Sequence, residues 1–179
     1  MKKFLAIALV AVLAMTAVFA NGSSESASEI KIGFIGPLTG DYANYGTLCR
    51  QAVEMAIDEC NAKGGINGST VKLVAEDSEG DPNKALAAME KLANTDKVCA
   101  VVGPVLTGEA FSVGPVACEL GVLAVTPSAS HKDVTNQGDY IFRTTPSDGL
   151  QGEVAGKYWA QVLGYKKIAT LYAKNDYSQ

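Results

Sequence analysis

Apolar positions along the chain alternate between short continuous runs and stretches with helical spacing. Four runs predict strands, at 29–36, 71–75, 98–103 and 122–125. Between them, apolar residues recur three and four positions apart in three stretches, at 44–63, 82–93 and 107–120. That spacing predicts amphipathic helices. Strands that alternate with helices over short connections predict an α/β fold: a three-layer arrangement with a parallel sheet and helices on both faces.

Turn and cap residues mark the ends of these elements. Gly64 and Gly65 end the first predicted helix. Asp81 precedes Pro82, so Asp81 is expected to cap the second helix and Pro82 to occupy its first position. Pro115 lies inside the third helical stretch, so this helix is either kinked at Pro115 or begins there.

The pattern restarts near residue 140. A short extended piece at 140–143 is followed by turn residues at 144–149, a helical stretch at 150–163 and a predicted strand at 167–172. One helix and one strand cannot complete a second parallel sheet, because an unpaired strand leaves its backbone donors and acceptors unsatisfied. We therefore expect residues 30–143 to form one complete lobe, and 144–179 to form a hinge crossing and the truncated start of a second, similar lobe. The alternative is that the last strand joins the first sheet.

The N-terminus has the features of an export signal. Lys2 and Lys3 precede an almost wholly apolar stretch, 4–18, and small residues at Val18 and Ala20 occupy the positions that a signal peptidase reads. This predicts a cleaved signal peptide over 1–20 and a flexible, polar leader over 21–29. A transmembrane anchor is the alternative, but the apolar stretch is short for one and no stop-transfer charges follow it.

Four cysteines accompany this export signal, at positions 49, 60, 99 and 118. In an oxidising compartment they can pair in three ways. Cys49 and Cys60 are expected on one helix, eleven residues apart, which is too far for a disulfide between them. Buried free thiols are the alternative to pairing, and the sequence favours it.

Composition and motifs exclude several functions. The chain has 15 Lys and Arg against 19 Asp and Glu, and a net charge of −4 argues against a nucleic-acid partner. Its one histidine and isolated cysteines form no metal-binding pattern. The glycines after the first strand match no nucleotide-binding motif, so no cofactor is expected. Ser128, Ser130, His131 and Asp133 are the residue types of a hydrolase triad, but no G-x-S-x-G elbow is present, and a hydrolase is only a remote alternative.

Hydroxyl side chains follow two of the predicted strands. Thr107 comes after the third strand and precedes a helix, and Ser128 and Ser130 come after the fourth. In open parallel sheets, ligands bind outside the carboxyl ends of the strands, where free backbone N–H groups and the helix dipole hold carboxylates. Hydroxyls add donors and acceptors without charge, which suits a small zwitterion. These hydroxyls could equally be simple helix caps, and their positions alone do not decide.

Several motifs, in order and with matching spacing, resemble a known family. The runs are KIGFIGPLTGDYANYGTLCRQAVEM, VVGPVLTGEA, VLAVTPSAS and FRTTPSDGLQG. They resemble the branched-chain amino-acid (Leu/Ile/Val) binding proteins of ABC transporters, over about residues 30–179. That family has the type I periplasmic binding fold, with two lobes that close on a ligand. The resemblance implies a monomeric, periplasmic solute-binding protein that is not an enzyme and delivers an amino acid or similar amide to a membrane permease. An extracellular ligand-binding lobe of a sensory receptor is the alternative.

The resemblance also implies a set of ligand-binding residues. Tyr45 would lie over the ligand. Thr107 would hold the α-carboxylate through its side chain and its backbone N–H. The Ser128 carbonyl and the Ser130 hydroxyl would take the α-ammonium, and the Ser130 N–H would assist with the carboxylate. Tyr177 would contribute from the second lobe.

Two features of the family have no counterpart here. Some members join the loop before Asp-Pro to the loop after the third strand by a disulfide, but Gly80 and Leu106 hold those places in this chain. The acidic residue that pairs with the ligand ammonium lies later in the family's sequence. The selectivity of the pocket for ligand side chains is therefore not defined by this sequence.

Overall fold

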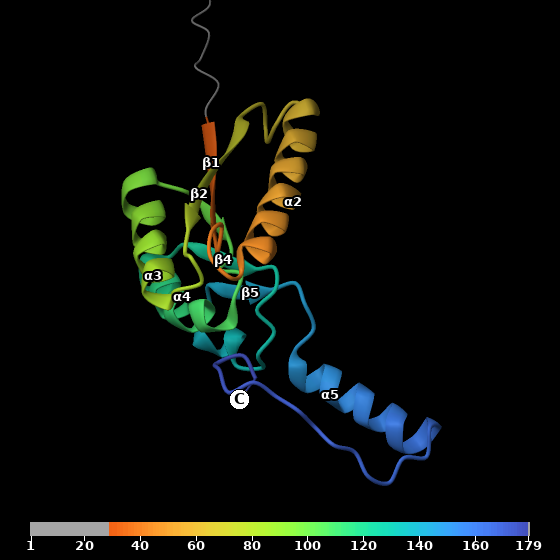
Figure 1. Cartoon of the computed structure of the whole chain (residues 1–179). Coiled ribbons are helices and arrows are strands. Elements are labelled where there is room, and N and C mark those ends of the chain that lie inside the picture. Colours follow the sequence, from red (N-terminus) through yellow and green to blue (C-terminus); the bar gives the residue numbers. More distant parts are fainter. Residues whose placement is uncertain (1–28, 179) are drawn as a thin grey trace, which may run out of the picture.

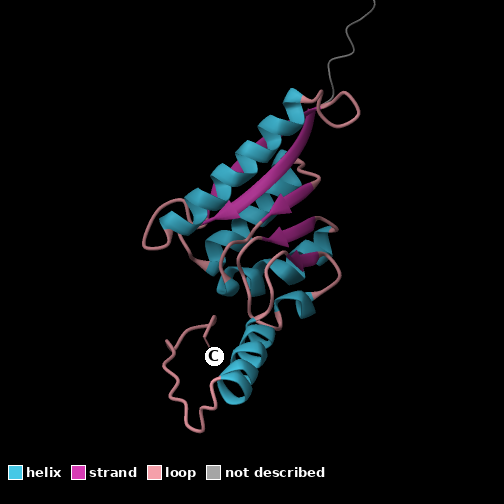
Figure 2. Cartoon of the chain, turned by 90° about the vertical axis from the view of Figure 1, so that its right-hand side faces the viewer, coloured by secondary structure: helices cyan, strands magenta, loops and turns pink. Residues whose placement is uncertain are grey.

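The computed structural model describes residues 29–178. Within them, five parallel strands form one sheet with the order β2-β1-β3-β4-β5 (Figures 1 and 2). The strands are β1 (Glu29–Gly36), β2 (Thr70–Asp77), β3 (Ala100–Val102), β4 (Leu123–Thr126) and β5 (Ile141–Arg143). The α/β class and the parallel sheet predicted from the sequence are confirmed.

Helices cover both faces of this sheet. Those that cover it are α2 (Ala43–Ala62), α3 (Pro82–Lys91) and α4 (Thr107–Leu120), whereas α5 (Asp148–Lys157) lies away from the sheet. Three shorter helical turns are η1 (Leu92–Asp96), η2 (Val134–Gln137) and η3 (Tyr158–Val162). Helix α2 lies on one face, while α3 and α4 pack side by side on the other (Figure 1). The chain passes from β1 to β2 in one direction across the sheet and from β2 to β3 and β4 in the other, so right-handed crossovers put α2 on one face and both α3 and α4 on the opposite face.

The main hydrophobic core lies between the sheet and the pair α3 and α4. Ile35 and Val101 from the sheet, Met89 and Leu92 at the end of α3, and Val113 from α4 are almost completely buried. Full burial of such a side chain contributes about 1.5 to 3 kcal/mol. Helix α2 buries only Gly46, so most of the packing energy comes from the other face.

The predicted helix ends can be checked in two places. The Asp81 carboxylate accepts hydrogen bonds from the backbone N–H groups of Asn83 and Lys84, with Pro82 at the first helical position, which confirms the predicted cap. Helix α4 runs from Thr107 through Pro115 to Leu120. The interpretation that this helix begins at Pro115 is therefore wrong.

Helix α5 and the chain that follows it project away from the sheet (Figure 2) before residues 175–177 return to its carboxyl edge, and no side chain of residues 144–178 is buried. The helix predicted at 150–163 is confirmed by α5 and η3. The strand predicted at 167–172 is wrong, and so is its pairing with the first sheet, because β5 remains the edge strand. The segment has an apolar sequence, but no neighbouring strand offers it backbone partners. A lobe boundary at 143/144 remains a prediction.

Two further sequence predictions concern other parts of the chain. The signal peptide at 1–20 and all but the last residue of the leader lie outside the described residues. Across residues 29–178, we find no helix that combines the length and apolarity needed to cross a membrane. All four cysteines are free thiols, as expected, but they are not fully buried, and Cys99 is exposed.

Candidate functional site

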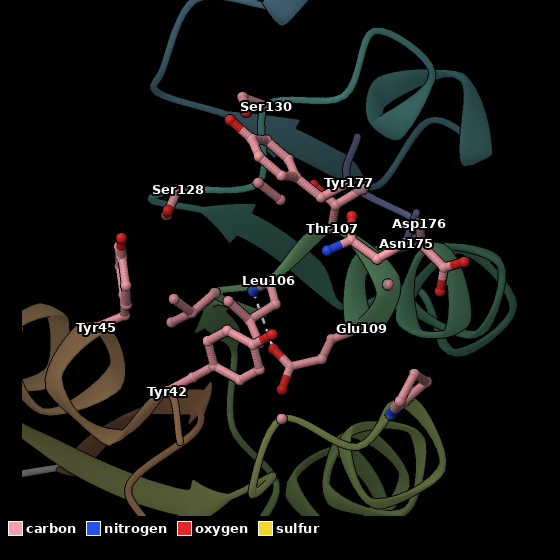
Figure 3. A pocket seen from close by; sticks show the side chains of 15 residues that line it. Tyr42, Tyr45, Leu106, Thr107, Glu109, Ser128, Ser130, Asn175, Asp176 and Tyr177 are labelled. Carbon is pink, nitrogen blue, oxygen red and sulfur yellow. Dashed lines mark hydrogen bonds between the residues drawn. The ribbon is translucent and has the colours of Figure 1, made fainter. Parts of the chain in front are cut away.

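A pocket of about 460 Å³ opens at the carboxyl ends of the strands (Figure 3). Loops that follow β1, β2, β3 and β4 all contribute to its wall, and the C-terminal segment 175–177 covers one side. Strand β1 lies between β2 and β3, so the strand order changes direction at β1. The pocket lies at the carboxyl edge beside this switch point, where parallel sheets commonly bind ligands. The five residues singled out in the sequence all line the pocket: Tyr45, Thr107, Ser128, Ser130 and Tyr177.

The N-terminus of α4 supplies the pocket's available donors. The residue that precedes the helix is Leu106, whose apolar side chain cannot accept from the N–H groups of the first turn. Thr107 follows it, is only 3 % exposed, and its Oγ1 is buried without a hydrogen-bond partner among the described residues. An unsatisfied buried hydroxyl costs about 1 to 3 kcal/mol. A ligand carboxylate at this position would satisfy both the Thr107 hydroxyl and the helix N-terminus.

A buried carboxylate holds this turn in place. Glu109 is 0 % exposed, and its Oε2 accepts from the Leu106 N–H at 3.0 Å while its Oε1 accepts from the Ser78 hydroxyl at 2.5 Å. Burial raises the pKa of Glu109, the hydrogen bonds from Ser78, Leu106 and Val105 lower it, and the charge of Asp77 raises it further, with a raised pKa as the net result. Glu109 thus ties the end of β2 to the turn that carries Thr107.

Glu109 was not predicted from the sequence. An acidic residue three positions after an N-cap is a recognised signal, but it is normally identified by Ser, Thr, Asp or Asn at the cap itself. Here Leu106 occupies the cap, so the three-residue spacing between Leu106 and Glu109 did not indicate a helix start in the sequence.

The Ser128–Ser130 segment is shaped by the end of β4 and by the start of α5. Thr126 Oγ1 accepts from the backbone N–H of Ala129 at 2.9 Å. The Ser130 hydroxyl donates to Asp148 Oδ2 at 3.0 Å, and the Asp148 N–H donates to the Ser130 carbonyl at 2.9 Å. Asp148 is a second residue that the sequence analysis missed, because it lies in a run of turn residues. The Ser130 hydroxyl therefore meets an acidic group at the pocket wall.

The loop after β1 brings two tyrosines to the rim. Asp77 accepts from the Leu38 N–H at 2.7 Å and from the Thr39 hydroxyl at 2.6 Å, which fixes the loop that leads into α2. Partial burial raises the pKa of Asp77, but the hydrogen bonds that its carboxylate accepts outweigh this effect and keep the pKa below its ordinary value. Tyr42 and Tyr45 follow, and Tyr45 is 60 % exposed at the mouth of the pocket. Its aromatic ring thus lies at the rim of the pocket.

The residue types of a hydrolase triad take part in local turns instead. Ser130 donates to Asp148, and His131 Nδ1 accepts from the Asp133 N–H at 3.2 Å. The His131 ring also meets Phe111 edge-on, with 5.2 Å between ring centroids. Among residues 29–178, no group of three or more His, Cys, Asp or Glu side chains is arranged to hold a metal ion.

Comparisons with known proteins agree with this architecture. The model of a family described as periplasmic binding protein matches residues 29–179. A leucine-, isoleucine-, valine-, threonine- and alanine-binding protein from Pseudomonas aeruginosa is 40 % identical over 157 residues, covering 87 % of this chain and 42 % of that protein. The chain thus spans about two fifths of the length of this curated relative.

Solved structures are similar as well. One is a branched-chain amino acid transporter substrate-binding protein from Streptococcus pneumoniae in complex with isoleucine, with a TM-score of 0.72 and 34 % identity over 76 % of this chain and 39 % of that one. Another is a solute-binding protein of an ABC transporter from R. palustris in complex with 4-hydroxybenzoate, with a TM-score of 0.71 and 30 % identity over 84 % of this chain and 40 % of that one. Fold, site and sequence agree, and the chain belongs to the periplasmic binding protein family.

Proposed function

We propose that the chain forms the ligand-binding lobe of an ABC transporter substrate-binding protein for a branched-chain amino acid or a similar small amino acid or amide. The observation that carries the proposal is the N-terminus of α4. There, the buried Thr107 hydroxyl lacks a partner and an apolar cap leaves the first-turn N–H groups uncapped, at a pocket on the carboxyl edge of the sheet. The relatives named for Leu, Ile and Val binding support the same ligand class.

The proposed ligand pose follows from the groups around the pocket. The α-carboxylate accepts from the Thr107 hydroxyl and N–H, with help from the Ser130 N–H. The α-ammonium donates to the Ser128 carbonyl and the Ser130 hydroxyl oxygen. Tyr45 covers the ligand from the rim, and Tyr177 contacts it from the C-terminal segment, which lines the pocket in the structure. Binding uses no catalytic step, so the function requires no nucleophile, metal or cofactor.

The proposed export and delivery of the ligand to a permease follow the pattern of the periplasmic binding protein family. The positively charged and apolar N-terminus supports export of the protein to the periplasm with removal of the signal peptide. The monomeric state is proposed from the family resemblance. Closure of two lobes over the ligand is the event that a membrane permease would detect. A sensory receptor lobe would bind ligand in the same way, and a transmembrane helix after the second lobe in the full reading frame would favour that alternative.

The experiment is an NMR titration of the ¹⁵N-labelled chain with L-leucine, L-isoleucine and L-valine into the millimolar range. Because closure and part of the pocket wall depend on the rest of a two-lobed protein, binding to this chain alone is expected to be weak. The expected result is saturable shifts of the amide signals of Thr107, Gly108 and Ser130, which lie at the proposed carboxylate and ammonium positions. Saturable shifts confined to other residues, or none with any of the three amino acids, would overturn the proposal.

A further inference from the structure

The charged side chains that line the pocket are all acidic. Glu109 lies under the turn before α4, and Asp176 comes from the C-terminal segment, where its Oδ2 lies 3.0 Å from the position a Cβ on Gly108 would occupy. No Lys, Arg or His side chain lines the pocket in the described part of the chain. Another acidic group, Asp148, accepts a hydrogen bond from the hydroxyl of Ser130, which lines the pocket. A ligand that enters the pocket therefore meets negative charge.

Glu109 is the charge that water screens least. It is 0 % exposed, whereas Asp176 is exposed to solvent. Across residues 29–178, no basic side chain is found in an ion pair with Glu109, and its partners are the donors Ser78 and Leu106. Backbone N–H groups can only donate, so they favour the ionised carboxylate. Burial raises the pKa of Glu109, while the donors around it stabilise the ionised form, so a poorly screened carboxylate lies behind the proposed carboxylate-binding turn.

We infer that Glu109 is a specificity-determining residue, whose buried negative charge makes the pocket select carboxylate ligands that also carry a positive group over purely anionic carboxylates. The inference rests on the proposed function, because it takes the ligand carboxylate to bind at the N-terminus of α4. It adds to the proposed function an electrostatic role for Glu109, which acts on the ligand without a direct contact.

The physical reason is that two negative charges meet at one helix end. The N-terminus of α4 attracts a carboxylate, but Glu109, at the third helical position, already offsets part of that positive field. An anionic ligand then gains little from the helix and is repelled by Glu109 through a poorly screening interior. A zwitterion suffers the same repulsion at its carboxylate but gains attraction at its ammonium. Ligands of the same shape are therefore separated by their charge.

This separation matters because the fold itself does not set the ligand's charge class. Among proteins of similar structure, one holds isoleucine, a zwitterion, and another holds 4-hydroxybenzoate, an anion. The charged side chains of the pocket can discriminate between the two classes in addition to its hydrogen-bonding groups, and of these charged side chains Glu109 is the buried one.

The test compares two ligands that differ only by the amino group, L-leucine and 4-methylpentanoate. Their affinities are measured by NMR titration of the whole chain in three forms: wild type, Glu109→Gln and, as a matched control, Glu119→Gln, which lies exposed on the same helix. Glu109→Gln should lower the ratio of leucine affinity to 4-methylpentanoate affinity by about tenfold. Glu119→Gln should leave the ratio unchanged. A purely structural role of Glu109 would weaken both ligands together and would not move the ratio.

The outcomes separate the two proposals. An unchanged ratio in a folded Glu109→Gln protein overturns the inference and leaves the proposed function intact. Failure of the wild type to bind leucine overturns the proposed function, and the inference with it. Should Glu109→Gln fail to fold, the wild type decides: L-leucine is expected to bind more tightly than 4-methylpentanoate, and equal affinities or the reverse order overturn the inference.

Discussion

The hydroxyl of Thr107 lies buried at the first position of α4, beside donors that the helix itself cannot use. Its place after the third strand could be predicted from the sequence, because the strand is a continuous apolar run and the helix spacing begins directly behind it. That Thr107 would be unpartnered could not be predicted. It depends on two neighbours. Leu106 at the cap position has no side-chain acceptor, and the Glu109 carboxylate accepts from the Leu106 N–H rather than from the Thr107 hydroxyl.

Replacement of Thr107 by Ala should weaken L-leucine binding by about tenfold to a hundredfold, because a hydrogen bond to a charged group contributes about 1.5 to 3 kcal/mol. Ser130→Ala should fall in the same range, and Tyr45→Ala should cost less, since it removes mainly apolar cover. Thr107→Ser keeps the hydroxyl and serves as the control. NMR titration measures each affinity, and an unchanged affinity in both alanine variants would remove the site assignment.

Asp77 should stabilise the fold through the loop that it holds after β1. Its pKa in the folded state lies below the ordinary value of 3.8, so its contribution is complete above that pH and is lost as the pH falls through the folded value. Asp77→Asn should therefore lower the free energy of unfolding by about 1 kcal/mol at neutral pH, and the difference should shrink in acid. Urea unfolding across pH measures this. Asp58→Asn, exposed on α2, is the control, and a pH-independent deficit in Asp77→Asn would contradict the prediction.

At the scale of elements, the sequence predicted best where the local signals agreed. The span of α2 and the start of α3 were predicted to within a residue or two, because apolar spacing, Asp81-Pro82 and the double glycine all indicate the same boundaries. The segment 167–172 shows the opposite case. Its residues favour a strand, but a strand requires a partner, and the described chain places none beside it. Local pattern fixes propensity, whereas pairing is decided by the rest of the molecule.

Gly46 makes the contact between α2 and the loop after β1 possible. A Cβ on Gly46 would lie 1.9 Å from the carbonyl oxygen of Pro37, which is backbone and cannot move aside cheaply. Gly46→Ala should destabilise the protein by about 1 to 3 kcal/mol. The matched control is Gly152→Ala in α5, where a Cβ would meet nothing within 4 Å and the better helix propensity of Ala should be neutral or stabilising. Equal unfolding midpoints for the two variants in urea would show that the Pro37 contact is not tight.

At the scale of the whole molecule, the residues of the site could be predicted further than its electrostatics. Strand ends and the family's motifs indicated Tyr45, Thr107, Ser128, Ser130 and Tyr177, and the structure gathers all of them around one pocket. Glu109 and Asp148 were not predicted because their roles depend on contacts across long sequence distances, to Ser78 directly after β2 in one case and to Ser130 in the other. Charge buried by tertiary packing has no local sequence signature, and here it belongs to the ligand pocket.

The two parts of the chain should also differ in their resistance to proteolysis. The sheet and its helices bury a hydrophobic core, while residues 144–178 contain no buried side chain and contact the rest of the chain in few places: the Thr144 N–H, Asp148 with its hydrogen bonds to Ser130, and the pocket-lining residues 175–177. Brief digestion with subtilisin should therefore remove 144–178 and leave a resistant product that ends near Arg143, because cleavage follows local opening. Ser130→Ala breaks the side-chain tie to Asp148 and should speed the cut at 144–149, whereas Ser128→Ala, two residues away and without that bond, should not. Mass spectrometry of the time course identifies the products. Equal protection through residue 178, or early cuts between β1 and β5, would contradict a division of the chain at this point.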